Sequence, residues 1–260
     1  MRQRTSAIAT AVLLIAASVA TPAAARALDD IKASGTIVLC AHPSSLPFAK
    51  KDGARHGFQV EMAAALAKQL GVTLGQDWVI TRFDLNRTQC DIVMDSIVDP
   101  EAQEGSGLQV SKPYRRSGVV LALRGDDKRT RSLDALGGKR KVAVLASSIA
   151  AMTLDQRGID TVPNLFEDEA LAMLVKGEVD AAAVSSTSVG YYNLRHPGAK
   201  LRLLPAFDDN PELSWNVAVG MRRPDPALRA AVDQALDRMI ADGTVKRIYA
   251  NYGVVLQPPK

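Results

Sequence analysis

Aromatic residues are scarce in this chain: Phe, Trp and Tyr make up only 5% of its 260 residues. The core must therefore be built mainly from Ala, Val, Leu and Ile, which favours an α/β architecture over an aromatic-rich binding barrel. With 47% hydrophobic and 23% charged residues, the composition is that of an ordinary globular protein. The length allows one large domain or two smaller ones.

The chain also lacks a strong excess of charge of either sign. Its formal net charge is +4, and three of its 32 basic residues, Arg2, Arg4 and Arg26, lie within positions 1–27. Without that segment, 29 basic residues stand against 28 acidic ones, which leaves a charge near +1. Because the sequence has no Lys/Arg stripe and no alternation of aromatic and basic residues, we expect no nucleic-acid partner.

Catalytic and metal-binding motifs are missing as well. There is no Gly-x-Ser-x-Gly, no His-Glu-x-x-His, and the three histidines have no ligand spacing. The acidic run Glu167-Asp168-Glu169 is interpreted as the first turn of a helix, which attracts acidic residues, rather than as a cation site. We therefore expect no catalytic residue, no metal and no cofactor.

The one long apolar run is at the N-terminus. Arg2 and Arg4 precede an almost purely apolar stretch over 7–20. At about 14 residues, this stretch is shorter than the ~20 needed to span a bilayer. The layout is typical of a secretory signal over residues 1–27 and predicts export to the periplasm.

Two cleavage motifs fit the end of this signal. Ala23-Ala24-Ala25 and Ala25-Arg26-Ala27 both place small residues where a signal peptidase requires them. The sequence does not choose between them, and an uncleaved membrane anchor is the alternative. No cysteine lies at either motif, so we expect no lipid anchor.

Only two cysteines are present, Cys40 and Cys90. An even number in an exported protein predicts one disulfide, with two buried thiols as the alternative. A bridge closing this loop would stabilise the fold by roughly 4 kcal/mol on the chain-entropy model.

Apolar strand-like runs alternate with amphipathic helical segments along the rest of the chain. Over 58–70, for example, Met62, Leu66 and Leu70 recur at four-residue spacing and Gly71 ends the helix. Strands are expected at 36–41, 78–80, 90–94, 118–123, 141–145, 161–162, 179–184, 201–204 and 215–221. Helices are expected at 58–70, 149–156, 167–175, 188–194, 226–241 and 245–251.

The strands at 118–123 and 215–221 are alike in length and character, and we interpret them as two crossings between lobes. Residues 28–123 and 209–260 would then form a discontinuous first lobe, and residues 124–208 an inserted second lobe. A crevice between two α/β lobes is a usual place for a small ligand.

Several short motifs, in this order and spacing, resemble the family 3 periplasmic solute-binding proteins. The matching segments are Gly57-Phe58-Gln59-Val60-Glu61-Met62-Ala63, Cys90-Asp91-Ile92-Val93, Lys112-Pro113-Tyr114, Gly177-Glu178-Val179-Asp180-Ala181 and Asp242-Gly243-Thr244-Val245-Lys246-Arg247-Ile248-Tyr249. The resemblance covers about residues 35–253. It implies an α/β, two-lobed periplasmic binding protein fold of type II, monomeric, with a hinge and a cleft that closes by domain motion.

Two positions depart from the amino-acid-binding members of that family. Those members carry an Arg for the ligand carboxylate where this chain has Ala102, and an Asp for the ligand ammonium where it has Ser185. Burying a zwitterion without charged partners is costly. The resemblance therefore implies that an ordinary amino acid is not the ligand.

A narrower resemblance is to the subgroup associated with quinoprotein (methanol) dehydrogenases, the MxaJ/XoxJ type. It is carried by the segments 39–48 and 89–94, although this chain has His42-Pro43-Ser44-Ser45 where that subgroup tends to have Asp-Pro-Asn-Asn. The resemblance implies a periplasmic accessory partner of a PQQ-dependent dehydrogenase. The alternatives are the substrate-binding component of an ABC importer, with a permease and a small polar solute as partners, and a dehydratase of the same fold using Asp95 and His42.

If a small ligand binds, the loops at the strand ends should line its site. Ser147 and Ser148 at a helix start could cradle an anion, and capping of that helix is the alternative. Ser185, Ser186 and Thr187 have the same two interpretations, and His42 is more readily a surface residue than a metal ligand. The full set of candidates is His42, Ser44, Ser45, Phe48, Asp95, Ser96, Tyr114, Ser147, Ser148, Ser185, Ser186 and Thr187.

Overall fold

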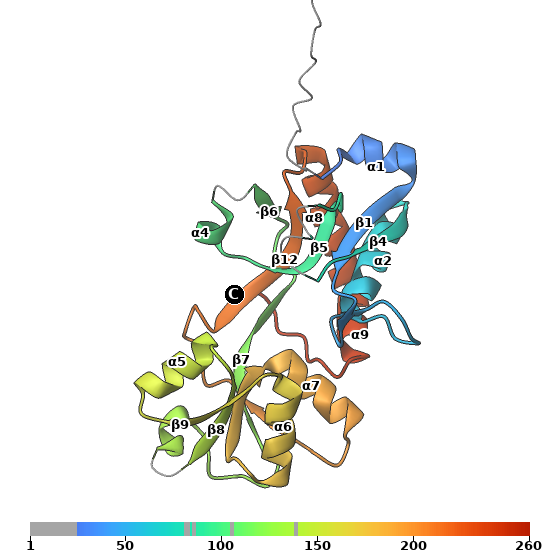
Figure 1. Cartoon of the computed structure of the whole chain (residues 1–260). Coiled ribbons are helices and arrows are strands. Elements are labelled where there is room, and N and C mark those ends of the chain that lie inside the picture. The colour runs from blue at the N-terminus through green and yellow to red at the C-terminus, as the bar shows by residue number, and fades with distance from the viewer. Residues whose placement is uncertain (1–24, 81–83, 85–86, 105–106, 138–139) are drawn as a thin grey trace, which may run out of the picture.

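Two α/β lobes share one ten-stranded sheet with the strand order β4-β1-β5-β12-β7-β10-β8-β9, in which β6 pairs with β12 and β11 with β7. The computed structural model describes residues 25–80, 84, 87–104, 107–137 and 140–260 (Figure 1). Apart from residues 25–27, the expected signal segment lies outside the described residues. Among the helices of the described part, none is long and apolar enough to cross a membrane.

Lobe 1 is the upper lobe in Figure 1. Its strands β1, β4 and β5 are parallel, as expected for βαβ crossovers, and β12 closes the lobe antiparallel to β5. Its elements are α1 (Leu28–Ser34), β1 (Thr36–Ala41), β2 (Ser44–Ser45), β3 (Ala49–Lys50), α2 (Phe58–Leu70), β4 (Thr73–Trp78), β5 (Ile92–Ile97), α4 (Pro100–Gln103), β6 (Leu108–Val110), β12 (Ser214–Arg222), α8 (Pro226–Ala241) and α9 (Thr244–Ala250).

Lobe 2 is the lower lobe. Its strands β8, β9 and β10 are parallel, and β7 runs antiparallel to β10. Its elements are β7 (Arg115–Leu123), the 3₁₀ turn η1 (Leu133–Leu136), β8 (Lys141–Leu145), α5 (Ile149–Gln156), β9 (Asp160–Asn164), α6 (Glu167–Lys176), β10 (Ala181–Ser185), α7 (Ser186–Arg195) and β11 (Arg202–Leu204).

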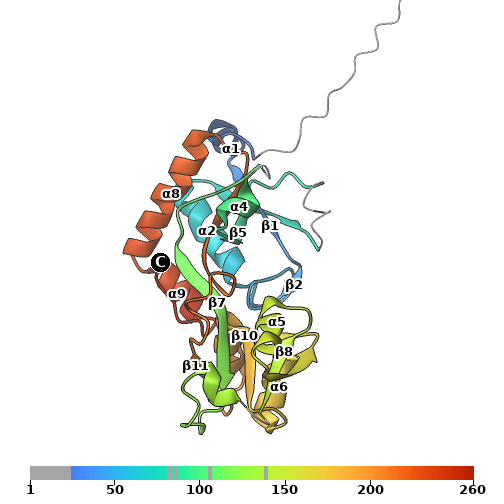
Figure 2. The same cartoon turned by 90° about the vertical axis from the view of Figure 1, so that its left-hand side faces the viewer.

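The two crossing strands pair with each other. Residues Ser214–Val217 of β12 lie antiparallel to Arg115–Gly118 of β7, and each strand then continues into a different lobe. Figure 2 shows β7 descending from lobe 1 into lobe 2. β7 begins three residues earlier than the sequence predicted, because its polar first residues, Arg115–Ser117, carry no apolar run, and β12 is longer by one residue at each end.

The strand expected at 78–80 is wrong: the structure places β4 at Thr73–Trp78. This strand lies at the edge of the sheet and pairs residue by residue with β1. Its sequence, TLGQDW, alternates apolar and polar residues only loosely, and none of its six side chains is buried, so it lacks the apolar signature of a buried strand. The strand expected at 90–94 is likewise displaced to Ile92–Ile97.

Each lobe has its own core. In lobe 1, α2, α8 and α9 pack their apolar faces on the sheet, with Phe58, Leu66 and Met239 fully buried. In lobe 2, the residues of β7 alternate between two clusters: Leu121 faces α5, whereas Val120 and Ala122 face α6 and α7. The lobe bounds 28–123 with 209–260 and 124–208 stay a prediction, since β7 contributes side chains to both lobes.

Cys40 and Cys90 form a disulfide, so the prediction of one bridge is confirmed. Cys40 lies in β1, and Cys90 lies just before the neighbouring parallel strand β5. The bridge therefore ties two adjacent strands of lobe 1 and closes the loop that contains α2 and β4.

The lobes also touch where α7 meets the segment that follows α9. Gly190 of α7 packs against Gly253, and the Tyr191 and Tyr252 rings lie 6.3 Å apart between centroids. A Cβ added at Gly190 would lie 2.3 Å from the Gly253 carbonyl oxygen, a backbone atom that cannot rotate away. The two glycines thus allow this close approach.

We expect Gly190→Ala to lower the free energy of unfolding by about 1–3 kcal/mol, the usual cost of overpacking. The matched control is Gly198→Ala, since a Cβ at Gly198 meets nothing within 4 Å. Thermal unfolding of both variants is the measurement. Equal melting temperatures for the two variants would show that the close contact between Gly190 and Gly253 does not contribute to stability.

Candidate functional site between the lobes

The sheet topology turns the carboxyl ends of both sets of parallel strands toward the gap between the lobes. From its pairing with β7, β12 runs away from lobe 2, so the antiparallel β5 and its parallel neighbours β1 and β4 run toward lobe 2. By the same argument β8, β9 and β10 run toward lobe 1. We call these two sets of strand ends the facing edges. Ligands of open α/β sheets bind beyond the carboxyl ends of strands.

Asp95 and Tyr114, two candidates of lobe 1, lie in the core instead of on a facing edge. Two residues of β5, Met94 and Asp95, stand opposite the single residue Val219 of β12, so β5 has a bulge there. A bulge bends a strand and re-aims its side chains. Asp95 has a positive φ of 54°, and its side chain is only 6% exposed. Tyr114 is buried, and its hydroxyl accepts a hydrogen bond from the Asp95 N–H at 3.0 Å.

Asp95 forms a buried ion pair with Arg115, whose side chain is 3% exposed. Its Oδ1 accepts hydrogen bonds from the Arg115 Nε at 3.1 Å and from the Tyr249 hydroxyl at 2.8 Å. The guanidinium also lies over the Tyr249 ring, 4.7 Å from its centroid. Burial raises the pKa of Tyr114 and of Tyr249, and the negative charge of Asp95 raises both further.

The remaining candidates of lobe 1 are largely engaged by neighbours. Phe48 packs on Phe58, with ring centroids 5.1 Å apart. His42 Nδ1 accepts a hydrogen bond from the Ser44 N–H at 3.0 Å, so this imidazole stabilises its own loop. Ser45 belongs to the short β2–β3 hairpin, and the Ser96 side chain fills the space above Gly220 of β12. A ligand contact by these residues stays a prediction.

On lobe 2, Ser147 and Ser148 precede α5 on a facing edge. The Ser148 hydroxyl accepts a hydrogen bond from the Ala151 N–H at 3.1 Å, which is N-capping, the alternative interpretation from the sequence. Ser147 is exposed and has a positive φ of 57°. Of the two, Ser147 leaves its side chain open to solvent at the start of the helix.

Ser185, which the family resemblance predicts to stand in the ammonium-binding position, is held by Glu167. The Glu167 carboxylate accepts hydrogen bonds from the Ser185 N–H at 2.7 Å, from the Ser185 hydroxyl at 2.9 Å and from the Ser188 hydroxyl. Ser185 also caps α7 through the Ser188 N–H. Thr187 is fully buried. An internal network therefore occupies the expected ammonium position.

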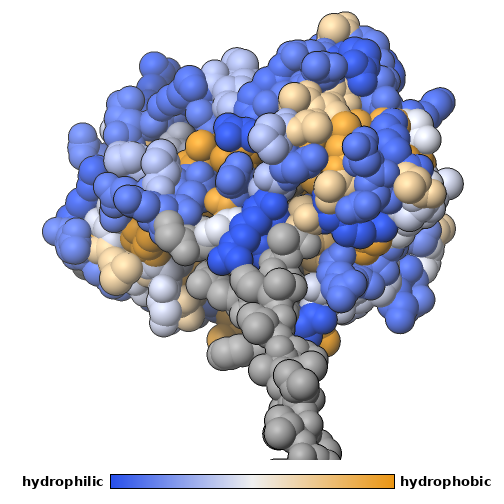
Figure 3. All heavy atoms as spheres, turned by 90° about the horizontal axis from the view of Figure 1, so that it is seen from above, coloured by the Kyte–Doolittle hydropathy of each residue, from blue (hydrophilic) through white to orange (hydrophobic). Residues whose placement is uncertain are grey.

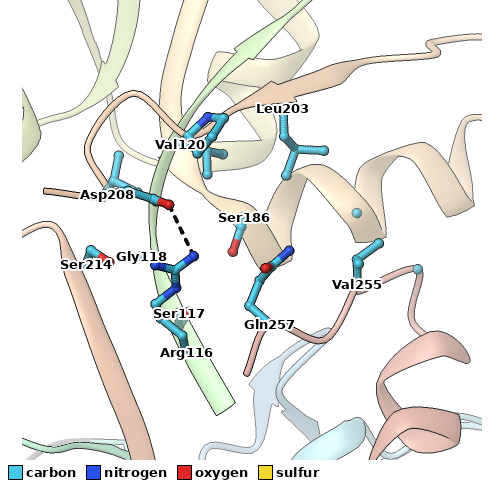
Figure 4. Close-up of a pocket in the computed structure, with 14 residues that line it drawn as sticks. Arg116, Ser117, Gly118, Val120, Ser186, Leu203, Asp208, Ser214, Val255 and Gln257 are labelled. Atoms are coloured by element: carbon cyan, nitrogen blue, oxygen red, sulfur yellow. Dashed lines mark hydrogen bonds and ion pairs between the residues drawn. The ribbon is translucent and has the colours of Figure 1, made fainter. Parts of the chain in front are cut away.

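A pocket of about 320 Å³ lies beside the crossing strands, and of the sequence candidates it includes Ser186. Figure 4 shows its lining gathered around β7, with the Arg116–Asp208 ion pair on one side and Val255 and Gln257 of the C-terminal segment on the other. That ion pair spans 3.1 Å. The pocket mixes apolar side chains with hydroxyl and amide groups, a lining that suits a small, largely neutral molecule.

Sequence reasoning missed Arg116, Asp208 and Gln257. They lie far apart in the chain and meet only through the paired crossings: the Arg116 N–H donates to the Gln257 carbonyl at 2.9 Å, and the Asn216 side chain bonds the Lys260 backbone at 3.0–3.1 Å. The pair Arg115-Arg116, just before the expected strand at 118–123, was the signal that the sequence offered.

Among the described residues, no group of three or more His, Cys, Asp or Glu side chains is placed to hold a metal ion. Glu167 and Asp168 are both engaged, the first with Ser185 and the second with Arg195.

Comparison with known proteins identifies the family to which this chain belongs. Residues 36–255 match the family model for bacterial extracellular solute-binding proteins, family 3. A curated relative, the "Probable amino-acid-binding protein YxeM" of Bacillus subtilis (strain 168), is 29% identical over 220 residues, 80% of each chain.

Solved structures share the fold. The periplasmic binding protein XoxJ from Methylobacterium extorquens AM1 is similar, with a TM-score of 0.65 and 21% identity over 85% of this chain and 98% of that one. MxaJ from Methlophaga aminisulfidivorans MPT gives a TM-score of 0.68 and 18% identity over 85% and 99%. Both have this two-lobed architecture.

Proposed function

We propose that this chain, which belongs to the bacterial extracellular solute-binding proteins of family 3, is a periplasmic accessory partner of a PQQ-dependent (methanol) dehydrogenase system. Members of this family generally bind rather than catalyse. It would act by protein–protein contact rather than as a carrier of an amino acid. The sequence resemblance to the MxaJ/XoxJ type and the shared fold support this choice of partner.

Exposed apolar side chains on the facing edges carry the proposal. On lobe 2, Leu165 is 74% exposed and Phe166 64%, directly after β9. On lobe 1, Ile80 is 70% exposed and Ile97 49%, near the ends of β4 and β5. Isolated exposed apolar residues are ordinary, but here they recur just beyond the carboxyl ends of strands in both lobes, and exposed apolar surface is a common feature of protein interaction sites.

The engaged ammonium position also supports the proposal. An amino acid needs a carboxylate or comparable acceptor free to pair with its ammonium group. Here Ser185 stands in that position, and the nearby Glu167 carboxylate already accepts three hydrogen bonds from Ser185 and Ser188. The sequence has Ala102 where an Arg would bind the ligand carboxylate.

The second candidate function is the substrate-binding component of an ABC importer. The name of the relative YxeM, a probable amino-acid-binding protein, favours it. The ligand would then be a small polar solute other than a plain amino acid, because neither charged anchor is present.

The test is recovery of a quinoprotein dehydrogenase with the tagged protein from periplasmic extract, together with a thermal-shift screen of small solutes on the same sample. We expect the wild type to recover the dehydrogenase and Phe166→Glu to lose it. The matched control is Ile240→Glu: this exposed apolar residue lies on α8 of lobe 1, and its variant should recover the dehydrogenase normally.

Both variants should melt like the wild type, because both side chains are exposed. A solute that raises the melting temperature, with no dehydrogenase recovered, would retire the accessory role in favour of the importer.

A further inference from the structure

Asp91 is a buried carboxylate in lobe 1, close to the first described residues of the chain. It precedes β5, and its side chain has no exposed surface. Its Oδ2 accepts a hydrogen bond from the Val38 N–H of β1 at 2.8 Å, and its own N–H donates to the Val38 carbonyl at 2.8 Å. A carboxylate buried in this way needs a cation beside it.

Arg26 supplies that cation. Its guanidinium bonds both carboxylate oxygens, Oδ2 from Nη2 at 2.8 Å and Oδ1 from Nε at 3.2 Å. The same side chain donates to the Ser34 hydroxyl at 2.9 Å and to the Thr36 carbonyl at 2.6 Å. The backbone nitrogen of Arg26 also lies 3.2 Å from Asp91 Oδ1. Arg26 thus presents two nitrogen groups to one buried carboxylate, from 65 residues away in sequence.

These contacts distinguish the two cleavage motifs. Cleavage after Ala27 would remove Arg26 and leave the Asp91 carboxylate without its guanidinium. Cleavage after Ala25 keeps every side-chain contact of Arg26 and costs the small buried side chain of Ala25 and one backbone hydrogen bond, from the Ala25 N–H to the Arg222 carbonyl. It also converts the Arg26 nitrogen from a neutral amide into a terminal ammonium, which places a second positive charge beside the Asp91 carboxylate.

We propose that a signal peptidase hydrolyses the Ala25–Arg26 bond, so that the new N-terminal ammonium and the guanidinium of Arg26 together neutralise Asp91. One water is consumed: its hydroxyl goes to the carbonyl carbon of Ala25, and the released amine takes up protons to become the ammonium. The described chain begins near α1, on a face whose surface is mostly hydrophilic (Figures 1 and 3). The inference rests on the proposed export and adds the bond that is cut.

The experiment is intact-mass analysis of the protein purified from the periplasm of cells that express the full chain. We expect a mature chain that begins at Arg26. A chain that begins at Leu28 would overturn this inference and leave export intact. A chain that still begins at Met1 and stays in the cytoplasm would overturn export, and this inference with it.

Two variants test the choice of motif directly. Ala27→Leu removes the small residue that cleavage after position 27 requires, and we expect it to leave the Arg26 start unchanged. Ala23→Leu removes the small residue that signal peptidase requires at the third position before the Ala25–Arg26 bond. We expect this variant to accumulate uncleaved precursor or to begin at Leu28. The opposite pattern would overturn the proposal.

The contact itself is tested by Arg26→Gln, with Arg229→Gln on the exposed surface of α8 as the matched control. We expect Arg26→Gln to lower the melting temperature by several degrees, Arg229→Gln to leave it unchanged, and the double variant Arg26→Gln/Asp91→Asn to recover part of the loss. Equal melting temperatures for Arg26→Gln and Arg229→Gln would contradict the neutralisation of Asp91.

Discussion

Replacing Asp95 with Ala is expected to destabilise the protein by about 3–5 kcal/mol, since removing one partner of a buried ion pair leaves the other charge uncompensated. The stranded charge is Arg115, whose side chain is 3% exposed. The Tyr249 hydroxyl would lose its carboxylate acceptor as well. Urea-induced unfolding followed by circular dichroism measures the change.

The double variant Asp95→Ala/Arg115→Met removes both charges and should recover most of that loss, because an apolar side chain suits the site between Phe58 and Tyr249. The matched control is Asp168→Ala. Its ion pair with Arg195 is 56% and 38% exposed, so we expect a loss of about 0–1 kcal/mol. If Asp95→Ala cost no more than Asp168→Ala, the buried pair would not stabilise lobe 1.

The second large effect is expected from the disulfide. Replacing both Cys40 and Cys90 with Ala should lower the free energy of unfolding by roughly 4 kcal/mol, because the loop between the two residues becomes unconstrained in the unfolded chain. The two strands that the bridge ties, β1 and β5, also pair with each other through their backbones. We therefore expect the double variant to reach the same fold.

Urea unfolding of the double variant, and of the wild type with and without reductant, is the measurement. The reduced wild type should approach the double variant, and non-reduced samples of the wild type should keep the full stability. A double variant that unfolds at the same urea concentration as the oxidised wild type would show that the bridge does not contribute.

Both effects concern lobe 1, where the sequence predicted ligand contacts. In the structure, Asp95, Tyr114 and Phe48 contact other side chains of lobe 1. Exposed apolar side chains such as Ile97 remain on the facing edge. This arrangement fits a lobe that presents a firm edge to a partner protein, which is the role we propose for it.

The sequence by itself predicted the two α/β halves, the two crossings and the single disulfide, and the family resemblance implied that the charged anchors are missing at Ala102 and Ser185. Periodicity revealed the buried helices, because one face of each packs on a sheet and repeats within a few residues. The same reasoning failed at β4, a mostly polar edge strand that pairs with β1 through backbone hydrogen bonds, which the side-chain pattern does not report.

The tertiary structure alone decided how the candidate residues are used. Asp95 faces the core because β12 sets a bulge in β5, and Ser185 is held by Glu167, 18 residues earlier in the chain. Arg26 finds Asp91 at a separation of 65 residues, and the pocket joins β7, α7 and the C-terminal segment. These partners meet only when strands far apart in sequence take up one register, because a buried charge selects its partner by proximity in space and not by spacing along the chain.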